Sequence, residues 1–135
     1  MDYLMNFSRL TIYEAGLPGI AVEVTLSLSE DSVTLPAKLD TGATNCVFAR
    51  RYGEDLGIDI ESGERVRIST ATGSFMTYRH DVTLTVLGFA FDVRVCFAED
   101  ETFSRDVLGR RGFLDRVKLG LVDYEGKLYL SRYDE

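Results

Sequence analysis

The residues best suited to chemistry form a short run, Asp40-Thr41-Gly42-Ala43, between an apolar segment that ends at Leu39 and a second apolar segment. An acid followed by Thr and Gly also suits an ordinary turn, in which Asp accepts a backbone hydrogen bond and Gly relaxes the backbone. The tripeptide alone is too short to be specific. Its place between two apolar strands predicts a partly buried carboxylate, and burying a lone charge is costly enough to point to a function.

A second segment near the C-terminus strengthens this interpretation: residues 106–115 read DVLGRRGFLD, an apolar strand end, a glycine turn and a short helix. Together the two segments resemble the retropepsin family of aspartic peptidases, including its bacterial members. The family pattern is Asp-Thr-Gly-Ala after an apolar pair, and later an apolar pair, Gly-Arg and a short helix ending in Phe-Leu or Leu-Leu. Here the later elements are Val107-Leu108, Gly109-Arg110 and Phe113-Leu114, and the resemblance extends over roughly residues 19–130.

The resemblance assigns a role to each matching residue. Asp40 is the expected catalytic acid and base. The Thr41 hydroxyl is expected to bond to the same loop of a partner chain and so to hold two carboxylates close. Gly42 gives the tight backbone and offers its carbonyl to the substrate, and Ala43 lines the cleft. Arg110 is expected to brace the loop that carries Asp40.

The chemistry requires two such carboxylates. Amide hydrolysis needs a nucleophilic water and a proton for the carbonyl oxygen, and two close carboxyl groups that share one proton supply both; aspartic proteases are the standard example of this dyad. The sequence holds one Asp-Thr-Gly, and no other Asp stands in an equivalent context. We therefore expect a homodimer with Asp40 from each chain at a two-fold axis, and an inactive monomer.

Residues 68–78 (ISTATGSFMTY) read as two strand arms around a polar tip that contains one Gly. Such a segment is either an ordinary exposed hairpin or a lid that covers the substrate and excludes water. Beside the two motifs the lid is favoured, with Thr72, Gly73 and Ser74 as its substrate-binding residues and Gly73 at its tip.

The rest of the chain predicts the frame that holds these residues. Apolar residues alternate with polar ones in residues 20–28, and the same period of two recurs further on, which is typical of half-buried strands. The expected strands are residues 3–13, 20–28, 33–39, 66–70, 82–86, 89–97 and 127–130, and the expected short helices are residues 49–56 and 110–116. The pattern predicts an all-β fold over residues 1–135, and the resemblance makes it a single retropepsin-like acid protease barrel that functions as a homodimer.

Composition excludes several other classes of protein. The 135 residues are 45% hydrophobic and 27% charged, which is enough apolar content for a core, and the formal net charge is −7. An acidic chain is a poor binder of nucleic acid or of an anionic membrane surface. The sequence has no apolar stretch near the roughly 20 residues that span a bilayer, and its first residues lack the pattern of a secretory signal, so we expect a cytoplasmic protein.

The cysteines and the histidine offer no metal site. Cys46 and Cys96 lie far apart in the chain without a CxxC spacing, and His80 is the only histidine. Two buried, reduced thiols are the expected state in a cytosolic chain. We expect neither a metal nor another cofactor.

Three positions leave alternatives open. Many viral relatives carry Asp where this chain has Thr44, and that Asp pairs with the helix arginine, so the acceptor for Arg110 is open. Lys38 either extends to solvent or lines the cleft, where it would favour an acidic substrate residue. The C-terminal strand pairs either across the dimer axis or within its own chain.

The sequence thus predicts an aspartic endopeptidase that acts on a peptide or protein substrate as a homodimer. One alternative is a catalytically inactive, dimeric module of the same fold that binds peptides or serves as a scaffold. Another is an unrelated small β-barrel that binds a small molecule. The intact Asp40, Thr41 and Gly42 favour the enzyme, because loss of function should change these residues first.

Overall fold

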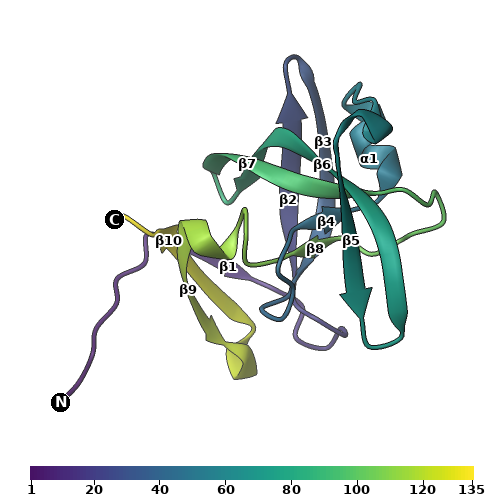
Figure 1. Ribbon diagram of the computed structural model, residues 1–135. Helices are drawn as coiled ribbons and strands as arrows, with labels where there is room; N and C mark the ends of the chain where they lie inside the picture. Colours follow the sequence, from purple (N-terminus) through teal and green to yellow (C-terminus); the bar gives the residue numbers. More distant parts are fainter.

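The computed structural model describes residues 1–135 and folds them into two β-sheets (Figure 1). The larger sheet has seven strands, and an extra pairing between its strands β2 and β6 closes it into a barrel, with β5 paired to β6 outside the closure. In sheet order its strands are β2 (Ala21–Leu28), β3 (Asp31–Leu39), β8 (Val107–Leu108), β4 (Val47–Phe48), β7 (Phe89–Ala98), β6 (Gly73–Val86) and β5 (Glu64–Thr70).

Alternating apolar residues build the barrel interior. In β2, Val22, Val24 and Leu26 are buried, and the residues between them point outward. In β7 the side chains from Phe89 to Val95 alternate in the same way, and those from Val95 to Ala98 are all buried. Because period-two alternation places one face of each strand on the core, the predicted all-β class is confirmed.

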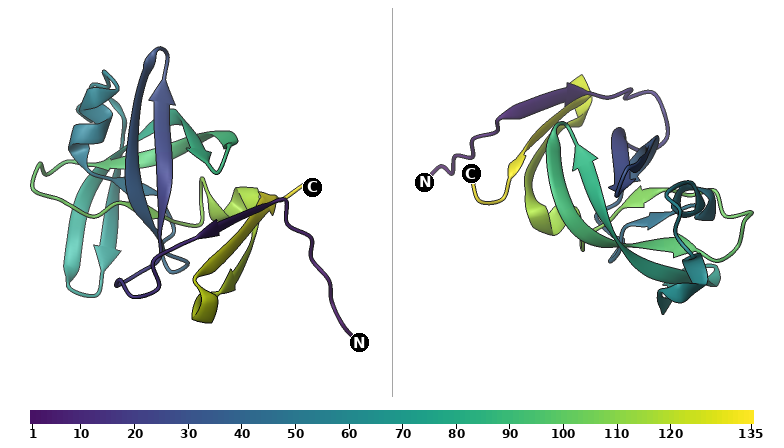
Figure 2. Two further views of the ribbon diagram at one scale, coloured as in Figure 1. Left: turned by 180° about the vertical axis from the view of Figure 1, so that it is seen from behind. Right: turned by 90° about the horizontal axis from the view of Figure 1, so that it is seen from above.

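The smaller sheet joins the two ends of the chain (Figure 2). Its order is β1 (Arg9–Ile12), β10 (Lys127–Arg132) and β9 (Val117–Val122), all antiparallel. Strand β10 lies in the middle and uses both of its edges within its own chain. The open alternative for the C-terminal strand is therefore resolved in favour of pairing within the chain.

The helical elements are all short. Helix α1 (Arg50–Asp55) lies within the predicted helix, and the 3-10 turns are η1 (Ile60–Ser62), η2 (Leu114–Arg116) and η3 (Asp123–Glu125). The predicted helix over residues 110–116 is wrong except for η2. Gly112 adopts a φ of +104°, which no right-handed helix contains, and this ends any helix that would begin at Arg110.

Two strand predictions also differ from the structure. The strand predicted over residues 3–13 forms only at Arg9–Ile12, the part that pairs with β10, and residues 3–5 are exposed. Strand β9 was not predicted, although Val117, Leu119 and Leu121 alternate as a strand requires. No helix in the structure has both the length and the apolar character to cross a membrane.

Candidate active site

Asp40 follows directly from β3, and a parallel strand fixes the point at which β3 ends. Leu39 lies opposite Leu108 of β8, and the backbone N–H of Asp40 donates to the Leu108 carbonyl at 3.0 Å. Since β8 also pairs with β4, which follows the loop, the end of β3 and the two short strands β8 and β4 hold both ends of the Asp40 loop. The two motifs that were separate in the sequence thus form one structure.

The loop itself is a hydrogen-bonded turn. One carboxylate oxygen of Asp40, Oδ1, accepts the N–H of Gly42 at 3.0 Å, and the N–H of Ala43 donates to the Asp40 carbonyl at 3.2 Å. The Ala43 carbonyl then accepts the N–H of Arg110 at 2.9 Å. The geometry fixes one oxygen of the Asp40 carboxylate and leaves Oδ2 without a hydrogen bond inside the chain.

Gly109 allows the loop and the segment after β8 to lie against each other. A Cβ at this position would overlap the backbone carbonyl of Asn45 and lie 2.8 Å from the carbonyl oxygen of Ala43. The Gly109 N–H also faces the sulfur of the buried Cys46 at 3.4 Å. Only a residue without a side chain fits here, which explains in physical terms why Gly precedes Arg110.

Asp40 lies in a cleft of about 650 Å³ between its own loop, the β5–β6 hairpin and the loop that leads into β8. In Figure 1 the hairpin and the Asp40 loop extend from the same side of the barrel. The cleft has an apolar part and a polar part, and Asp40 is the only carboxylate in its wall. The lining residues are Asp40, Gly42, Ala43, Thr44, Asn45, Val47, Arg67, Ile68, Ser69, Thr70, Phe75, Phe103, Arg105 and Val107.

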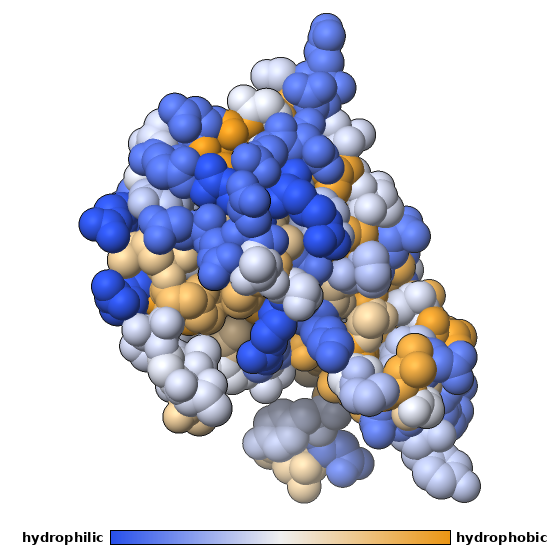
Figure 3. Space-filling view, turned by 90° about the vertical axis from the view of Figure 1, so that its right-hand side faces the viewer, coloured by the Kyte–Doolittle hydropathy of each residue, from blue (hydrophilic) through white to orange (hydrophobic).

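An aromatic pair links the hairpin to the opposite wall of the cleft. The rings of Phe75, on β6, and Phe103, in the loop before β8, have centroids 4.7 Å apart. Figure 3 views the molecule from the side on which this loop lies and shows hydrophobic areas among a largely hydrophilic surface. The hairpin therefore covers one side of the cleft and is held there by a contact within the same chain.

The predicted lid residues lie at the end of this hairpin rather than in the cleft wall. The turn consists of Ala71 and Thr72, and Gly73 opens β6 with a φ of +146°, which favours glycine. Ser74 accepts a hydrogen bond from Arg67 at 3.2 Å. Residues Arg67 to Thr70 of β5, together with Phe75, form the part of the hairpin that lines the cleft.

The remaining predicted residues occupy the rim of the site. Thr41 is exposed, and its hydroxyl has no hydrogen bond within the chain. Arg110 is exposed and forms no ion pair; it borders a small cavity of about 390 Å³ with Thr44 and Leu114. Lys38 does not line the cleft, because its side chain packs against Gly19.

The match to known families comes from the same part of the chain. The aspartyl protease family model matches residues 22–121, which include the Asp40 loop, the hairpin and the Gly109 segment. The chain belongs to the aspartyl protease family. The resemblance found in the two motifs is thereby confirmed.

Two solved structures share the fold of this aspartyl protease chain. A retropepsin-like aspartic protease from Rickettsia conorii has a TM-score of 0.64 at 16% identity, over 91% of this chain and 97% of that one. EIAV protease in complex with the inhibitor HBY-793 has a TM-score of 0.54 at 22% identity, over 69% and 83%. The predicted retropepsin-like fold is confirmed. A search of curated proteins finds no match.

Two arginines of the cleft were not among the predicted site residues. Arg67 belongs to β5, and Arg105 belongs to the loop before β8; both side chains are exposed and both line the cleft. One signal was present for Arg67, since Arg65 and Arg67 lie just before a stretch rich in hydroxyl groups, residues 69–74. No local pattern marks Arg105, because its place in the cleft depends on the path of the whole loop.

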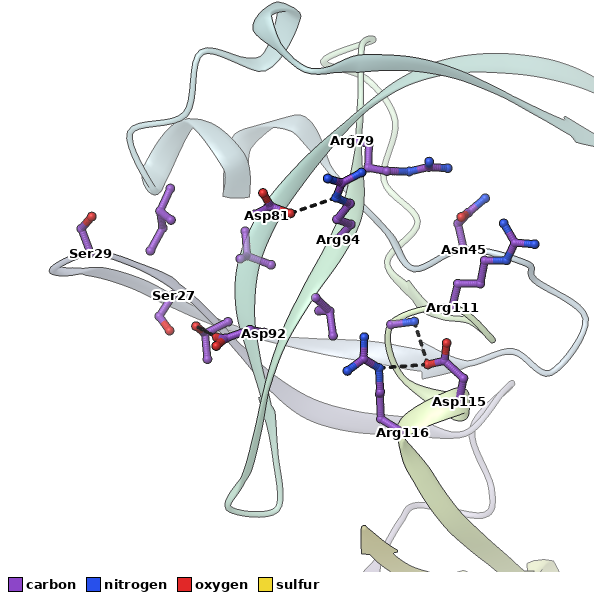
Figure 4. Close-up of a pocket in the computed structure, with 15 residues that line it drawn as sticks. Ser27, Ser29, Asn45, Arg79, Asp81, Asp92, Arg94, Arg111, Asp115 and Arg116 are labelled. Atoms are coloured by element: carbon purple, nitrogen blue, oxygen red, sulfur yellow. Dashed lines mark hydrogen bonds and ion pairs between the residues drawn. The ribbon is translucent and has the colours of Figure 1, made fainter. Parts of the chain in front are cut away.

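A second groove lies outside this cleft, between β2, β6, β7 and the segment after Gly109 (Figure 4). It has a volume of about 700 Å³ and shares Asn45 with the cleft. Its charged residues are mostly paired, with Arg94 on Asp81 at 3.1 Å and Arg116 on Asp115 at 3.5 Å. We call it the side groove.

The cysteines match their predicted state. Cys46 and Cys96 are buried and form no disulfide. Burial raises the pKa of the Cys46 thiol to about 12, so it stays protonated near neutral pH. No group of three or more His, Cys, Asp or Glu side chains is placed to hold a metal ion.

Proposed function

We propose that the chain is an aspartic endopeptidase that hydrolyses peptide bonds as a homodimer, with one Asp40 from each chain forming the catalytic dyad. The observation that carries the proposal is that Asp40 is the only carboxylate in the wall of a partly apolar cleft, at the end of a strand in an aspartyl protease fold. One carboxylate can act as an acid or as a base, but general acid and base are needed together at the same substrate carbonyl.

The dyad supplies both roles at once. The charged Asp40 takes a proton from a water molecule as that water attacks the carbonyl carbon of the peptide bond. The protonated Asp40 of the partner donates its proton to the carbonyl oxygen, and a tetrahedral diol results. One carboxyl group then protonates the amide nitrogen as the C–N bond breaks, while the other carboxylate takes a proton from a diol hydroxyl as the carbonyl re-forms. These two transfers return the pair to its starting state of one shared proton.

Features of the loop support a site at a two-fold axis. Thr41 is exposed at the loop and has no partner for its hydroxyl within the chain, so we propose that it bonds to the Asp40 loop of the second subunit. The Gly42 N–H holds one oxygen of each carboxylate at 3.0 Å, which orients the dyad. A two-fold interface brings the same surface of both chains together, so the Thr41 hydroxyl of each chain would find its partner in the loop of the other chain.

The other predicted residues surround the dyad. Ala43 lines the cleft beside the substrate, and the backbone of Arg110 braces the loop through its N–H bond to Ala43. We propose that the hairpin end at Thr72, Gly73 and Ser74 closes over the peptide. An extended peptide would then lie between this lid and the dyad, shielded from water.

The first test compares wild-type protein with Asp40→Asn on a library of unstructured peptides, with cleavage read by mass spectrometry. We expect Asp40→Asn to lower the cleavage rate at least about 1,000-fold, because the amide can neither take nor share the proton. Asp92→Asn, the same change in the side groove, is the matched control and should cleave like the wild type. Equal cleavage by Asp40→Asn would overturn the enzyme and leave the inactive module as the better interpretation.

A mixing experiment tests the dimer. Asp40→Asn protein is added to wild-type protein at a fixed wild-type concentration, with time for the subunits to exchange. If each site needs two Asp40 residues, an equal amount should lower activity to about half, and a tenfold excess to about a tenth, since mixed dimers are inactive. Unchanged activity at every ratio would show that one chain is sufficient.

A further inference from the structure

The charge of the cleft departs from the charge of the chain. The protein carries a formal net charge of −7, whereas the cleft wall holds two arginines, Arg67 and Arg105, and one carboxylate, Asp40. Basic residues in a cleft of an acidic protein concentrate positive potential at that cleft, and they favour groups of opposite charge. In the proposed peptidase, the molecule that enters this cleft is the substrate, so the positive potential would act on the charge of the substrate.

Neither guanidinium is neutralised by the protein. Arg67 forms a single hydrogen bond, to the neutral Ser74 hydroxyl at 3.2 Å, and no ion pair. Arg105 forms neither a side-chain hydrogen bond nor an ion pair, although Asp106 is its neighbour in sequence. The Asp106 carboxylate instead accepts the N–H of Ala49 at 2.8 Å. Both arginines therefore keep donors free on the cleft side.

The surroundings of these arginines would strengthen an ion pair formed with a ligand. Arg105 lies in the same loop as Phe103, whose ring packs on Phe75, and Arg67 precedes Ile68 in the cleft wall. A bound peptide would displace water from this apolar part of the cleft. The attraction between a guanidinium and a carboxylate grows as water is excluded, and the planar fork of Arg matches a carboxylate with two parallel bonds.

We propose that Arg67 and Arg105 select substrates that carry Asp or Glu side chains close to the cleaved bond. This inference rests on the proposed peptidase function and names its substrate class. In a two-fold dimer each chain brings its own pair of arginines, so acidic residues are accepted on both sides of the bond. Lys38, the residue that the sequence suggested for this role, lies against Gly19 and takes no part.

The test uses synthetic peptides that differ only by Glu, Gln or Lys at each position around a bond that the wild type cleaves. We expect kcat/KM to be about tenfold higher for the best Glu peptide than for its Gln counterpart, and lower still for Lys, as two partly exposed ion pairs would give. The ratio should fall as salt is added, because ions screen the attraction.

Substitutions of Arg67 and Arg105 test whether these two residues cause the preference for Glu peptides. Arg67→Gln and Arg105→Gln should each lower the Glu-to-Gln ratio by roughly threefold, and the double variant should bring it close to one. Arg105→Lys should keep part of the preference, because it keeps the charge and loses the fork. Arg94→Gln in the side groove is the matched control and should keep the full ratio. Thermal melting confirms that each variant is folded.

A binding measurement separates this inference from the proposed function. Calorimetry with Asp40→Asn protein measures preference without cleavage. It uses the same Glu and Gln peptides or, where the wild type cleaves none, Glu and Gln versions of one unstructured library peptide. Wild-type cleavage without a Glu preference, or a preference that survives the double arginine variant, would overturn the inference and leave the peptidase intact. Binding of Glu peptides that depends on both arginines, without wild-type cleavage, would overturn the peptidase alone. If the wild type cleaves no peptide and Glu peptides show no binding that depends on the arginines, both the inference and the proposed function are overturned.

Discussion

Two cavities of similar volume lie on either side of Asn45, and they treat charge in opposite ways. The side groove holds four arginines in its wall, and three of them pair with acids of the protein: Arg79 with Glu64, Arg94 with Asp81 and Arg116 with Asp115. The cleft holds Arg67 and Arg105, which pair with none, and a single Asp40. Figure 4 shows Arg94 pointing toward Asp81, and Arg116 pointing toward Asp115.

The difference separates a surface whose charges are nearly complete, with Arg111 as its one unpaired arginine, from a site whose arginines are both unpaired. Charges that are paired on the protein have little to gain from a ligand, since a ligand must first displace an existing partner. Several groups of the cleft region have no charged partner within the chain and are open to a second chain or a substrate: Oδ2 of Asp40, the Thr41 hydroxyl and the two guanidinium groups. This contrast supports the proposal that the cleft, and not the side groove, is the functional site.

The largest effect on stability is expected from a substitution that disturbs the wall shared by the two cavities. In Gly109→Ala the new Cβ would overlap the backbone of Asn45, which lines both cavities, and crowd the Ala43 carbonyl. We expect a loss of about 2 to 3 kcal/mol in the free energy of unfolding, because backbone cannot move aside as a side chain can. Urea unfolding followed by circular dichroism measures it.

Gly16→Ala is the matched control for this prediction. A Cβ at Gly16 would meet only a side-chain oxygen of Glu14, at 4.0 Å, and the backbone there has no positive φ. This variant should unfold within about 0.5 kcal/mol of the wild type. Equal unfolding midpoints for both variants would mean that the close packing at Gly109 does not hold the Asp40 loop.

A smaller effect is expected in the pH dependence of stability, at a residue between two residues of the cleft wall, Arg105 and Val107. Asp106 precedes β8, and burial raises the pKa of its half-buried carboxyl, while the Ala49 N–H and the charge of Arg51 oppose that rise. An acid with a raised pKa binds its proton more tightly when folded. Stability therefore falls as pH rises from the ordinary value of 3.8 through the raised one.

Asp106→Asn should remove this loss, because the amide oxygen still accepts the Ala49 N–H and carries no charge. We expect a slightly higher Tm than wild type at pH 7, with the difference vanishing below pH 3.8, measured by circular dichroism across pH. Asp100→Asn should behave in the opposite way, since hydrogen bonds from Thr102 lower the pKa of Asp100. A Tm for Asp106→Asn below wild type at pH 7 would contradict the prediction.

The sequence was sufficient for the part of the site that short-range patterns encode. Asp40 to Ala43 follow an apolar strand, and the Gly109 segment has its own pattern, so the family resemblance identified both segments. That β3 and β8 pair and bring the two segments together was not predicted. The hairpin was also predictable, because its arms alternate around a polar turn. Its turn lies one residue earlier than Gly73, as the register of Thr70 opposite Gly73 dictates.

The features of the site that could not be predicted from the sequence depend on how distant parts of the chain pack together. Lys38 and Arg105 are both cations next to a motif residue, and nothing local tells which one faces the cleft. Lys38 packs on Gly19 because β2 and β3 pair in that register, whereas Arg105 reaches the cleft through a loop whose path Phe103 fixes on Phe75. The N-terminal segment shows the same limit, since only the stretch that meets β10 became a strand.

The smallest expected effect belongs to the side groove. Arg94 and Asp81 lie 3.1 Å apart, but 67% and 80% of their side chains are exposed, so water and salt screen the pair. A double-mutant cycle of Arg94→Gln and Asp81→Asn should give a coupling below about 0.5 kcal/mol in unfolding free energy. Neither variant should change kcat/KM on any peptide, because each leaves the cleft charges unaltered. A change in peptide preference on losing Arg94 would mean that the groove binds part of the substrate, and the contrast between a nearly complete surface and an incomplete site would then fail.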